Sequence, residues 1–485
     1  MLGAVTAILQ ILAFAASPAD WAQFRGPNAS GVSESRLPDD FGPDRNVVWR
    51  TAVPPGNASP VLATDRVFLT GYEGDTLVTL AVDRASGKLL WRREAPRPRK
   101  QVIERPANGP TSASPVTDGR NAYVFFQDFG LLAYGPDGKE LWRMPLGPFR
   151  NPFGHGASPI LAGGTLFMVC DQDVGAYLLA VDTATGRVRW RPERPHAQRG
   201  YATPILYHPA NGRLQVIVAG SYRLSGYDAE TGKEIWWIRG LPWQVKPTPV
   251  VDGDTVYFVT FSGDSEPGEQ EHIPSFEQAL SKLDANRDGK LSKDELVDPR
   301  AKNLFDEYLD LDRTGYLEER DWKQYEERRL GGSALRAYRL GGEGDLTERN
   351  FLWKNSRSLP NVPSPLVYRG VLYTLKEGGI LTSYDPKTGA THKQARLQGA
   401  VGAYFESPIA ADGKILVISE EGKATVIRAG AQWEPIRVVD LADGCKATPA
   451  LSDGRMYLRT YGTLYCFGDP ETLTPATARP TSPPR

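Results

Sequence analysis

The segment Asp182-Thr-Ala-Thr-Gly186-Arg-Val-Arg-Trp190 decides the fold, because it joins a tight turn to a tryptophan at a fixed distance. Its counterpart is Asp228-Ala-Glu-Thr-Gly232-Lys-Glu-Ile-Trp236, and the same spacing recurs from Gly87 to Trp91 and from Gly138 to Trp142. Glycine allows the positive φ that such a turn requires. A tryptophan at this distance can fill the wedge between neighbouring sheets. The pattern therefore predicts a repeated sheet motif.

A second pattern sets the length of the repeat. Eight Ser-Pro or Thr-Pro pairs each open an apolar, alternating stretch, and they begin at Ser59, Ser114, Ser158, Thr203, Thr248, Ser364, Ser407 and Thr448. The intervals between their prolines are 55, 44, 45, 45, 116, 43 and 41 residues, so a period near 44 holds apart from two insertions. Four short strands in such a period are typical of a propeller blade. The sequence predicts an all-β, eight-bladed β-propeller.

The two ends of the repeat region complete one another. The last repeat runs out after its third strand, at residues 464–468, and residues 46–50 offer the missing fourth strand. Closure by an N-terminal strand would remove the exposed sheet edges. The predicted organisation is a signal peptide, a leader segment, the first part of the propeller, an inserted module in blade 5, the second part of the propeller and a disordered Pro/Thr-rich tail, at residues 1–16, 17–45, 46–263, 264–332, 333–468 and 469–485.

The N-terminal residues predict export. Residues 2–16 carry no charged side chain, end in small residues and form an apolar run too short for a membrane-spanning helix. We therefore expect a periplasmic or extracellular protein that is not integral to a membrane after cleavage, with an uncleaved anchor as the alternative. No cysteine that could carry a lipid lies near the expected cleavage site, because Cys170 is the first. Cys170, Cys445 and Cys466 cannot all pair within one chain, so buried free thiols are expected.

The charge balance argues against nucleic acid as a partner. The 485 residues include 57 Lys+Arg and 58 Asp+Glu, which gives a formal net charge of -1. A nucleic-acid-binding protein usually carries a strong positive charge over the binding region. We expect a protein, a peptide or an envelope polymer as the partner instead.

The repeats resemble those of the bacterial exported β-propellers with pyrroloquinoline-quinone-like (PQQ-like) repeats, which include the outer-membrane assembly scaffold BamB and the quinoprotein alcohol dehydrogenases. The resemblance rests on the two segments that end in Trp190 and Trp236. The segment Trp21-Ala-Gln-Phe-Arg-Gly-Pro27 is also similar to a leader that precedes the propeller in many exported members. The resemblance implies either a binding role in the cell envelope or a quinone-dependent oxidation.

Residues 284–295 match the constrained positions of an EF-hand calcium loop. Such a loop offers side-chain oxygens at positions 1, 3 and 5, a backbone carbonyl at 7, a water at 9 and a bidentate glutamate at 12. Gly289 allows the sharp turn at position 6. Ser275 and Gln278 could form a capping box on the entering helix. The predicted Ca²⁺ ligands are Asp284, Asn286, Asp288, Lys290 (through its carbonyl), Ser292 (through water) and Glu295.

A second loop follows, with two departures from the pattern. Thr314 replaces a carboxylate or amide, and Asp321 is one methylene shorter than the usual glutamate, which favours Mg²⁺ or weak Ca²⁺ binding. Leu291 and Leu317 could pair as a small β-bridge between the loops. The alternative is an acidic helical hairpin that binds no cation. The candidate ligands of this loop are Asp310, Asp312, Thr314, Tyr316, Glu318 and Asp321.

Polar residues just before the Ser/Thr-Pro pairs predict a site on the propeller axis. If the loop before the first strand of a blade and the loop between its second and third strands share one face, the inserted module overhangs the same mouth. A hydrated channel mouth lined by ordinary loops is the alternative. The candidates are Asn57, His155, Tyr201, Lys246, Glu406 and Lys446.

The search for catalytic motifs gives little support to an enzyme. The quinoprotein dehydrogenases that the repeats resemble carry adjacent cysteines against the quinone, and this chain has no Cys-Cys pair, so PQQ is not expected. The sequence contains no HExxH, Gly-x-Ser-x-Gly or phosphate-loop motif. We therefore favour a non-catalytic, calcium-binding scaffold of the cell envelope. The alternatives are a PQQ-dependent oxidoreductase at the axial mouth, or a hydrolase or lyase that would need His155, Glu406 and Lys446 to approach one another.

Overall fold

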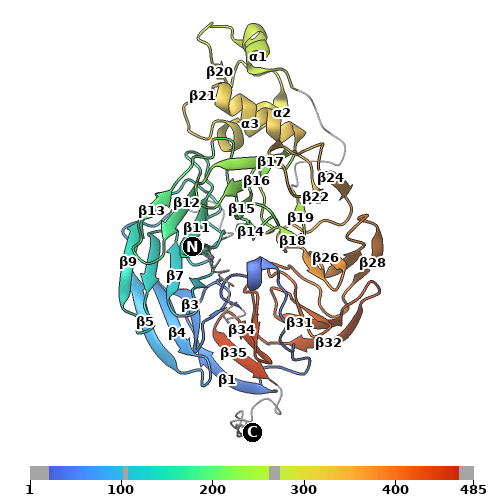
Figure 1. The fold of residues 1–485 in the computed structure, drawn as a ribbon. Helices are drawn as coiled ribbons and strands as arrows, with labels where there is room; N and C mark the ends of the chain where they lie inside the picture. Colours follow the sequence, from blue (N-terminus) through green and yellow to red (C-terminus); the bar gives the residue numbers. More distant parts are fainter. Residues whose placement is uncertain (1–20, 102–107, 262–272, 469–485) are drawn as a thin grey trace, which may run out of the picture.

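The computed structural model describes residues 21–101, 108–261 and 273–468. Over these residues the chain forms eight sheets arranged as a ring around one axis (Figure 1). Each of these sheets has four antiparallel strands, and one of them carries a fifth, short strand in parallel pairing, so the eight-bladed β-propeller predicted from the repeat is confirmed. Within a blade the two middle strands are almost fully buried, whereas the outermost strand alternates between buried and exposed positions, as in the Glu140–Pro145 strand.

The blades are numbered from the first Ser-Pro pair. Blades 1 and 2 consist of β2 (Val61–Leu62), β3 (Arg66–Glu73), β4 (Thr76–Asp83) and β5 (Leu89–Ala95), then β6 (Val116–Thr117), β7 (Ala122–Phe126), β8 (Gly130–Tyr134) and β9 (Glu140–Pro145). Blades 3 and 4 consist of β10 (Ile160–Ala162), β11 (Thr165–Cys170), β12 (Tyr177–Asp182) and β13 (Val188–Trp190), then β14 (Ile205–Tyr207), β15 (Gln215–Ala219), β16 (Arg223–Asp228) and β17 (Glu234–Arg239).

The second half of the ring repeats this arrangement. Blades 5 and 6 consist of β18 (Val250–Asp252), β19 (Thr255–Thr260), β22 (Ala334–Arg339) and β24 (Phe351–Asn355), then β25 (Leu366–Tyr368), β26 (Val371–Lys376), β27 (Ile380–Tyr384) and β28 (Thr391–Arg396). Blades 7 and 8 consist of β29 (Ile409–Ala411), β30 (Lys414–Ile418), β31 (Lys423–Arg428) and β32 (Glu434–Asp440), then β33 (Ala450–Ser452), β34 (Arg455–Arg459), β35 (Thr463–Gly468) and β1 (Val47–Ala52).

Strand β1 supplies the fourth strand of the last blade, as the sequence predicts. It pairs with β35 in antiparallel register, with Arg50 opposite Tyr465 and Thr51 opposite Leu464. Because the two ends of the propeller thus share one sheet, opening the ring would require the whole β1–β35 ladder to separate.

Tryptophans tie most blades to the next blade. The indole Nε1 of Trp142 donates to the carbonyl of Thr183 at 2.7 Å, and Trp142 lies against the turn glycine of blade 3, Gly186. A Cβ atom on Gly186 would lie 2.7 Å from the indole, and its φ of 69° favours glycine in any case. The same indole hydrogen bond runs from Trp49, Trp91, Trp190 and Trp353 to the carbonyls of Arg84, Pro136, Ala229 and Pro386.

Trp236 fills the next wedge in a different way. It is fully buried with apolar residues of blades 4 and 5, but its Nε1 donates to Oε1 of Gln215 in its own blade at 2.7 Å. The reason is the turn of blade 5, where β23 (Gly344–Asp345) lies parallel to β17 in place of the usual Asp-x-x-x-Gly turn. The described turn of blade 5 therefore provides no carbonyl to the indole of Trp236, unlike the turns that accept from the other tryptophans.

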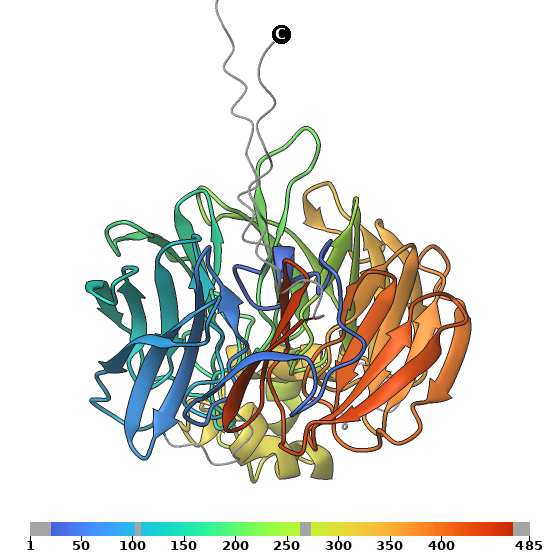
Figure 2. The same ribbon diagram turned by 90° about the horizontal axis from the view of Figure 1, so that it is seen from below.

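The leader crosses the end of the axis. The carbonyl of Trp21 accepts from the N–H of Leu62 at 2.9 Å, and Asn28 exchanges two hydrogen bonds with the backbone of Leu206. The short helix η1 (Pro27–Ala29) therefore lies at the centre of the ring (Figure 1). In Figure 2 it lies near the face opposite the helices of the inserted module.

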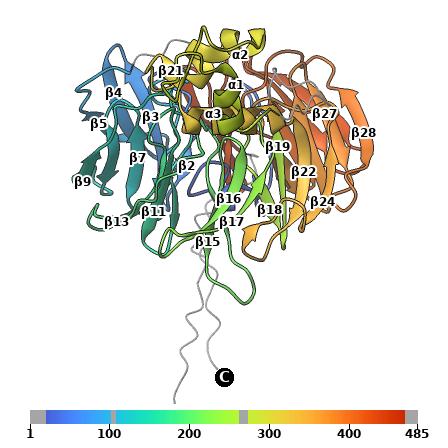
Figure 3. The same cartoon turned by 90° about the horizontal axis from the view of Figure 1, so that it is seen from above.

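The inserted module in blade 5 lies on one face of the propeller (Figure 3). In its described part, three helices and a π-helical turn flank two paired loops. The core of the module includes Phe305, Trp322 and Tyr325. The capping box of Ser275 and Gln278 is confirmed. Its elements are α1 (Phe276–Leu283), β20 (Leu291–Ser292), α2 (Pro299–Leu304), the π-helical turn η2 (Phe305–Leu309), β21 (Tyr316–Leu317) and α3 (Glu319–Leu330).

Several predicted segments lie outside the described residues: the signal peptide (1–16), part of the leader (17–20), the start of the inserted module (264–272) and the tail (469–485). Across the three described ranges, no helix is both long and apolar enough to cross a membrane. Cys170, Cys445 and Cys466 are all described, buried and unpaired, as expected.

Candidate functional site

Eight hydroxyl groups form a closed ring of hydrogen bonds around the axis. In each blade the backbone N–H of the Ser or Thr before the proline donates to the hydroxyl of the equivalent residue in the next blade, at 2.9 to 3.3 Å. The order is Ser59, Ser114, Ser158, Thr203, Thr248, Ser364, Ser407, Thr448 and back to Ser59. The spacing of these pairs predicts the repeat, but it does not predict that their hydroxyls join neighbouring blades.

This ring lines an axial cavity of about 370 Å³. Four of the six predicted axial residues line it as well: Asn57, Tyr201, Lys246 and Lys446. The residue two positions before the Ser or Thr of the pair therefore predicts the mouth correctly in these four blades. The lining residues that the sequence analysis did not single out include the amides Asn108, Gln244 and Asn361 and the aromatic residues Phe24, Phe153 and Phe405.

The leader limits the cavity at the end away from the mouth. Phe24 lies in its lining, and the next residue, Arg25, donates to the carbonyls of Pro365 and Pro408, which follow two ring residues in the chain. Arg25 is fully buried, and this burial lowers its pKa to about 9. The axial cavity is thus a pocket entered from the mouth and not a channel through the ring.

The two lysines of the cavity differ in their surroundings. Lys246 Nζ donates to Asn361 Oδ1 at 2.7 Å, and burial lowers the pKa of Lys246 to about 8. Lys446 Nζ forms an ion pair with Glu420 at 2.8 Å and lies 4.8 Å from the centre of the Phe405 ring. Lys446 is therefore partly neutralised at the rim, whereas Lys246 is held by an amide.

The other two axial candidates, His155 and Glu406, do not line the cavity. His155 is buried against Phe125 and Phe149, with ring centroids at 4.8 and 5.5 Å, and burial lowers its pKa to about 4. Glu406 is buried beside Cys445, and burial raises the pKa of its carboxyl well above the usual range. Among the described residues, no hydrogen bond or ion pair joins His155, Glu406 and Lys446, as a hydrolase or lyase site would require.

The first predicted metal loop is tied at both ends. The carboxylate of Asp284 accepts the N–H of Gly289 at 2.9 Å, where φ is 78°. The carboxylate of Glu295 accepts the N–H groups of Ala285 at 3.0 Å and Ser292 at 2.9 Å, and the Ser292 hydrogen bonds hold the pKa of Glu295 below its usual range. The first and last positions of the loop therefore fold it into one closed turn.

The remaining predicted ligands of this loop are Asn286, Asp288 and Lys290. The side-chain oxygens of Asn286 and Asp288 accept loop N–H groups, at 2.9 Å each. The donor set of carboxylates, amide and carbonyl fits a hard cation. However, no three His, Cys, Asp or Glu side chains converge as a metal centre anywhere in the described ranges, this loop included.

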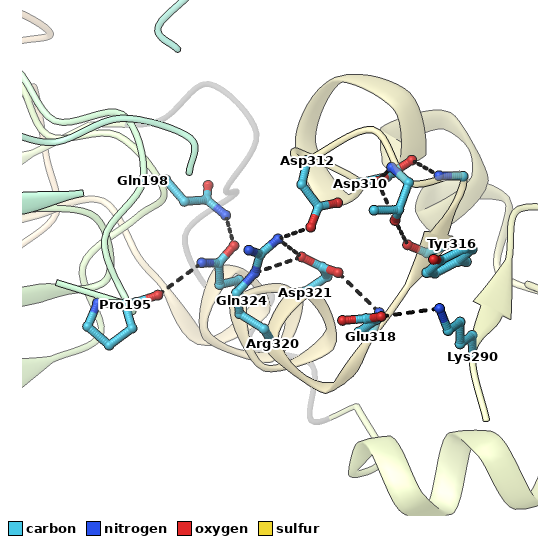
Figure 4. Close-up of polar contacts among 12 residues, drawn as sticks. Pro195, Gln198, Lys290, Asp310, Asp312, Tyr316, Glu318, Arg320, Asp321 and Gln324 are labelled. Carbon is cyan, nitrogen blue, oxygen red and sulfur yellow. Dashed lines mark hydrogen bonds and ion pairs between the residues drawn. The ribbon is translucent and has the colours of Figure 1, made fainter. Parts of the chain in front are cut away.

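The second loop differs in one decisive contact (Figure 4). The guanidinium of Arg320 donates to Asp312 Oδ2 at 2.9 Å and to Asp321 Oδ1 at 2.6 Å, so it bridges positions 3 and 12 of the loop. Asp321 is almost fully buried, and burial raises its pKa despite the arginine. Arg320 thus supplies a positive charge between two of the predicted ligands.

The other candidates of the second loop form local contacts. The carboxylate of Asp310 accepts the N–H groups of Thr314 and Gly315 at 2.9 and 2.8 Å, and the Thr314 hydroxyl donates to the carbonyl of Tyr316 at 3.0 Å. Glu318 forms an ion pair with Lys290 of the first loop at 3.3 Å (Figure 4). The two loops are also joined where β20 pairs with β21, and the predicted pairing of Leu291 with Leu317 is confirmed.

The inserted module packs on the mouth face. Gln198 Nε2 donates to Gln324 Oε1 of α3 at 2.6 Å (Figure 4), and a guanidinium nitrogen of Arg199 donates to the carbonyl of Glu307 at 2.9 Å. A second cavity of about 550 Å³ lies between the second loop and the propeller, and Phe153 lines both cavities. The module and the axial mouth therefore share one face, as the sequence analysis expected.

Comparisons with known proteins agree with this architecture. A family model described as "Outer membrane protein assembly factor BamB" matches residues 43–136, 127–264 and 196–472. Outer membrane protein assembly factor BamB of Shewanella oneidensis is 23% identical over 357 residues, which cover 72% of this chain and 79% of that protein. Its counterpart in Burkholderia pseudomallei is 27% identical over 202 residues, which cover 40% of this chain and only 45% of that protein.

Solved structures with the same fold include BamB from Moraxella catarrhalis, with a TM-score of 0.54, 12% identity and coverage of 87% of this chain and 97% of that one. A quinohemoprotein alcohol dehydrogenase from Pseudomonas putida gives a TM-score of 0.46 at 13% identity, over 96% of this chain and 82% of that one. The likeness to BamB from Moraxella catarrhalis concerns the fold alone. Because the family model covers nearly all of the propeller, this chain belongs to the PQQ-like propeller family described as outer membrane protein assembly factor BamB.

Proposed function

We propose that this chain is an exported, non-catalytic scaffold of the cell envelope that binds protein partners on its mouth face. The observation that carries the proposal is the family match along the whole propeller, together with two relatives named as outer membrane protein assembly factors. The plugged axis supports it, because a ring closed by its own leader offers its loops and faces for binding. The apolar N-terminal residues 2–16 support export.

Exposed apolar side chains on the loops of blades 6 to 8 mark a docking surface. Val401, Phe405 and Tyr461, here called the rim patch, are 59%, 38% and 37% exposed. Aromatic residues are enriched at the centres of protein interfaces, and polar residues surround them at the rim. Tyr461 donates to Glu420, which also holds Lys446, so the apolar groups of the rim patch lie beside a fixed polar network.

Site-specific photocrosslinking in the host envelope tests this surface. A photoreactive residue at position 461 or 405 is expected to yield a covalent adduct with a protein of the outer-membrane assembly machinery, identified by mass spectrometry. The same residue at Val188, which is 51% exposed on an outer strand, is the matched control and is expected to give no such adduct. Adducts at position 188 but not at the rim patch would contradict the proposal.

We also propose that the first loop of the inserted module binds one Ca²⁺ as a structural staple. The donor set of Asp284, Asn286, Asp288, the carbonyl of Lys290 and Glu295 supports this, because a hard cation takes six or seven oxygens of these types. The closed turn around Gly289 and the pairing of β20 with β21 also support the proposal, because paired EF-hand loops have both features. An ion there would draw the loop carboxylates together and offset their mutual repulsion.

Thermal melts of the full mature chain, with and without a chelator, test the staple. Calcium is expected to raise the melting temperature of the wild type and to have no effect on Glu295→Gln. Glu277→Gln removes one acid from the same module outside the loops and is expected to behave as wild type. A calcium effect that survives in Glu295→Gln would place the ion elsewhere.

A further inference from the structure

We propose that the axial cavity is a binding site for a carboxylate attached to an apolar or aromatic group. This inference goes beyond the proposed function and does not rest on it, because the cavity could bind its ligand whether or not a protein docks on the rim patch. Three properties of the cavity support this inference: its ring of hydroxyls, its charge and its aromatic walls.

The ring of hydroxyls presents donors. A hydroxyl group has one hydrogen to donate and two lone pairs to accept. Each of the eight ring hydroxyls accepts a backbone N–H from the neighbouring blade, and in the described part of the chain none donates to a protein acceptor. All eight line the cavity, so their hydrogens are available to a ligand that accepts hydrogen bonds. Charged acceptors such as carboxylates make the strongest hydrogen bonds of this kind.

The charged side chains in the described lining of the cavity are all positive. Its described lining contains two lysines, Lys246 and Lys446, and no aspartate or glutamate. Lys446 is paired with Glu420 at the rim, whereas Lys246 contacts the neutral amide of Asn361, and Glu377 acts on it only from a greater distance. This ammonium is already partly removed from water, so an incoming anion gives it a charge partner in a cavity where the attraction is only weakly screened.

The remaining walls are apolar. Phe24 closes the inner end, and Phe153, Tyr201 and Phe405 line the sides and rim. A volume of about 370 Å³ is at the lower end of the range for small-molecule sites. The site therefore fits the end group of a ligand with an acid and a ring better than a bulky polymer. The carboxylate can come from a free organic acid or from the C-terminus of a polypeptide.

Calorimetry on the full mature chain tests the proposal with matched pairs of probes. The first pair is 3-phenylpropionate and its neutral amide, and the second is the peptide Ala-Ala-Phe with a free or an amidated C-terminus. Each acid is expected to bind at least tenfold more tightly than its amide, with an affinity that falls as salt is raised. Tighter binding of the free peptide identifies a polypeptide end as the source, and tighter binding of phenylpropionate identifies a small acid.

Two variants link the binding to Lys246. Lys246→Met removes the charge while keeping a side chain of similar length, and Asn361→Asp places a carboxylate beside the ammonium. Each variant is expected to bind the acids at least tenfold more weakly than the wild type. Lys139→Met, at an exposed turn of blade 2, is the matched control and is expected to change nothing. Equal affinity for acid and amide, unchanged affinity in Asn361→Asp, or no binding of any acid would overturn the proposal.

Discussion

The backbone N–H of Thr448 donates to the hydroxyl of Ser59 at 3.0 Å and so joins two residues that are 389 positions apart in the chain. This hydrogen bond closes the ring of eight at the axis, just as the pairing of β1 with β35 closes it at the periphery. Two sets of contacts therefore close the propeller: the pairing of β1 with β35, and the hydrogen bond from Thr448 to the Ser59 hydroxyl. The strand closure lies within blade 8 and the hydroxyl closure joins blade 8 to blade 1, and both depend on contacts of long sequence separation.

Removing the hydroxyl of Ser59 is expected to destabilise the fold. In Ser59→Ala the buried N–H of Thr448 loses its acceptor, which costs about 1–3 kcal/mol for a buried group left unsatisfied. Ser112→Ala removes a hydroxyl that lines the same cavity outside the ring and is expected to stay within about 0.5 kcal/mol of wild type. Chemical denaturation measures both; equal effects would mean that the ring contributes nothing of its own.

The contact between Trp142 and Gly186 predicts a graded pair of glycine variants. Gly186→Ala places a Cβ atom at a φ of 69° and against the indole, whereas Gly163→Ala, at a φ of 52°, meets no atom within 4 Å. Gly163→Ala is expected to lose about 1 kcal/mol from the positive φ alone, and Gly186→Ala to lose clearly more. Unfolding free energies of the two variants compare the costs directly. An equal loss of unfolding free energy in the two variants would show that Trp142 can shift away from the new Cβ atom at no cost.

Arg320 is expected to take the place of a cation in the second loop. Arg320→Gln leaves Asp312 and the buried Asp321 without their shared guanidinium, so we expect a lower melting temperature in chelator. Millimolar Mg²⁺ or Ca²⁺ should restore part of that loss, because the freed acids can then bind a cation weakly. Lys323→Gln, which breaks an exposed ion pair with Glu319 on the same helix, is the control. If Mg²⁺ and Ca²⁺ leave the melting temperature of Arg320→Gln unchanged, this role for Arg320 is contradicted.

The buried carboxyl of Glu406 predicts a dependence on pH. Because burial raises its folded pKa above the unfolded value, its contribution to stability is complete below the unfolded pKa of about 4.5 and is lost as pH rises through the folded pKa. Glu406→Gln keeps the shape without the ionisation, so it should stabilise the protein at neutral pH and have little effect at pH 4. Melting curves at both pH values measure the difference, and a variant that destabilises equally at both would contradict the reasoning.

The repeat explains which parts of the site the sequence predicts. Asn57, Tyr201, Lys246 and Lys446 were found because a position fixed relative to the Ser/Thr-Pro pair is also fixed relative to the axis. Local patterns such as the Ser275 capping box succeed for the same reason: their partners are near in sequence.

The failures have equally specific causes. His155 lies three positions before its ring serine and Glu406 one position before, whereas the four residues found in the lining lie two positions before theirs. At that second position blades 3 and 7 carry Gly156 and Phe405, which do line the cavity. Arg320 was missed because it stands at a loop position that supplies no ligand, so the motif gives it no role. The turn of blade 5 that redirects Trp236 departs from the repeat, and its pairing with β17 has no sequence signature.

The inserted module separates this chain from a plain propeller, and its cation content tests the account most directly. Calcium titration of the full mature chain by calorimetry is expected to give one ion per chain, with no binding heat in Glu295→Gln and unchanged binding in Glu277→Gln. That result would assign the ion to the first loop. It would also agree with a second loop in which Arg320 takes the place of a cation. Two ions per chain, or one ion that survives in Glu295→Gln, would contradict the account.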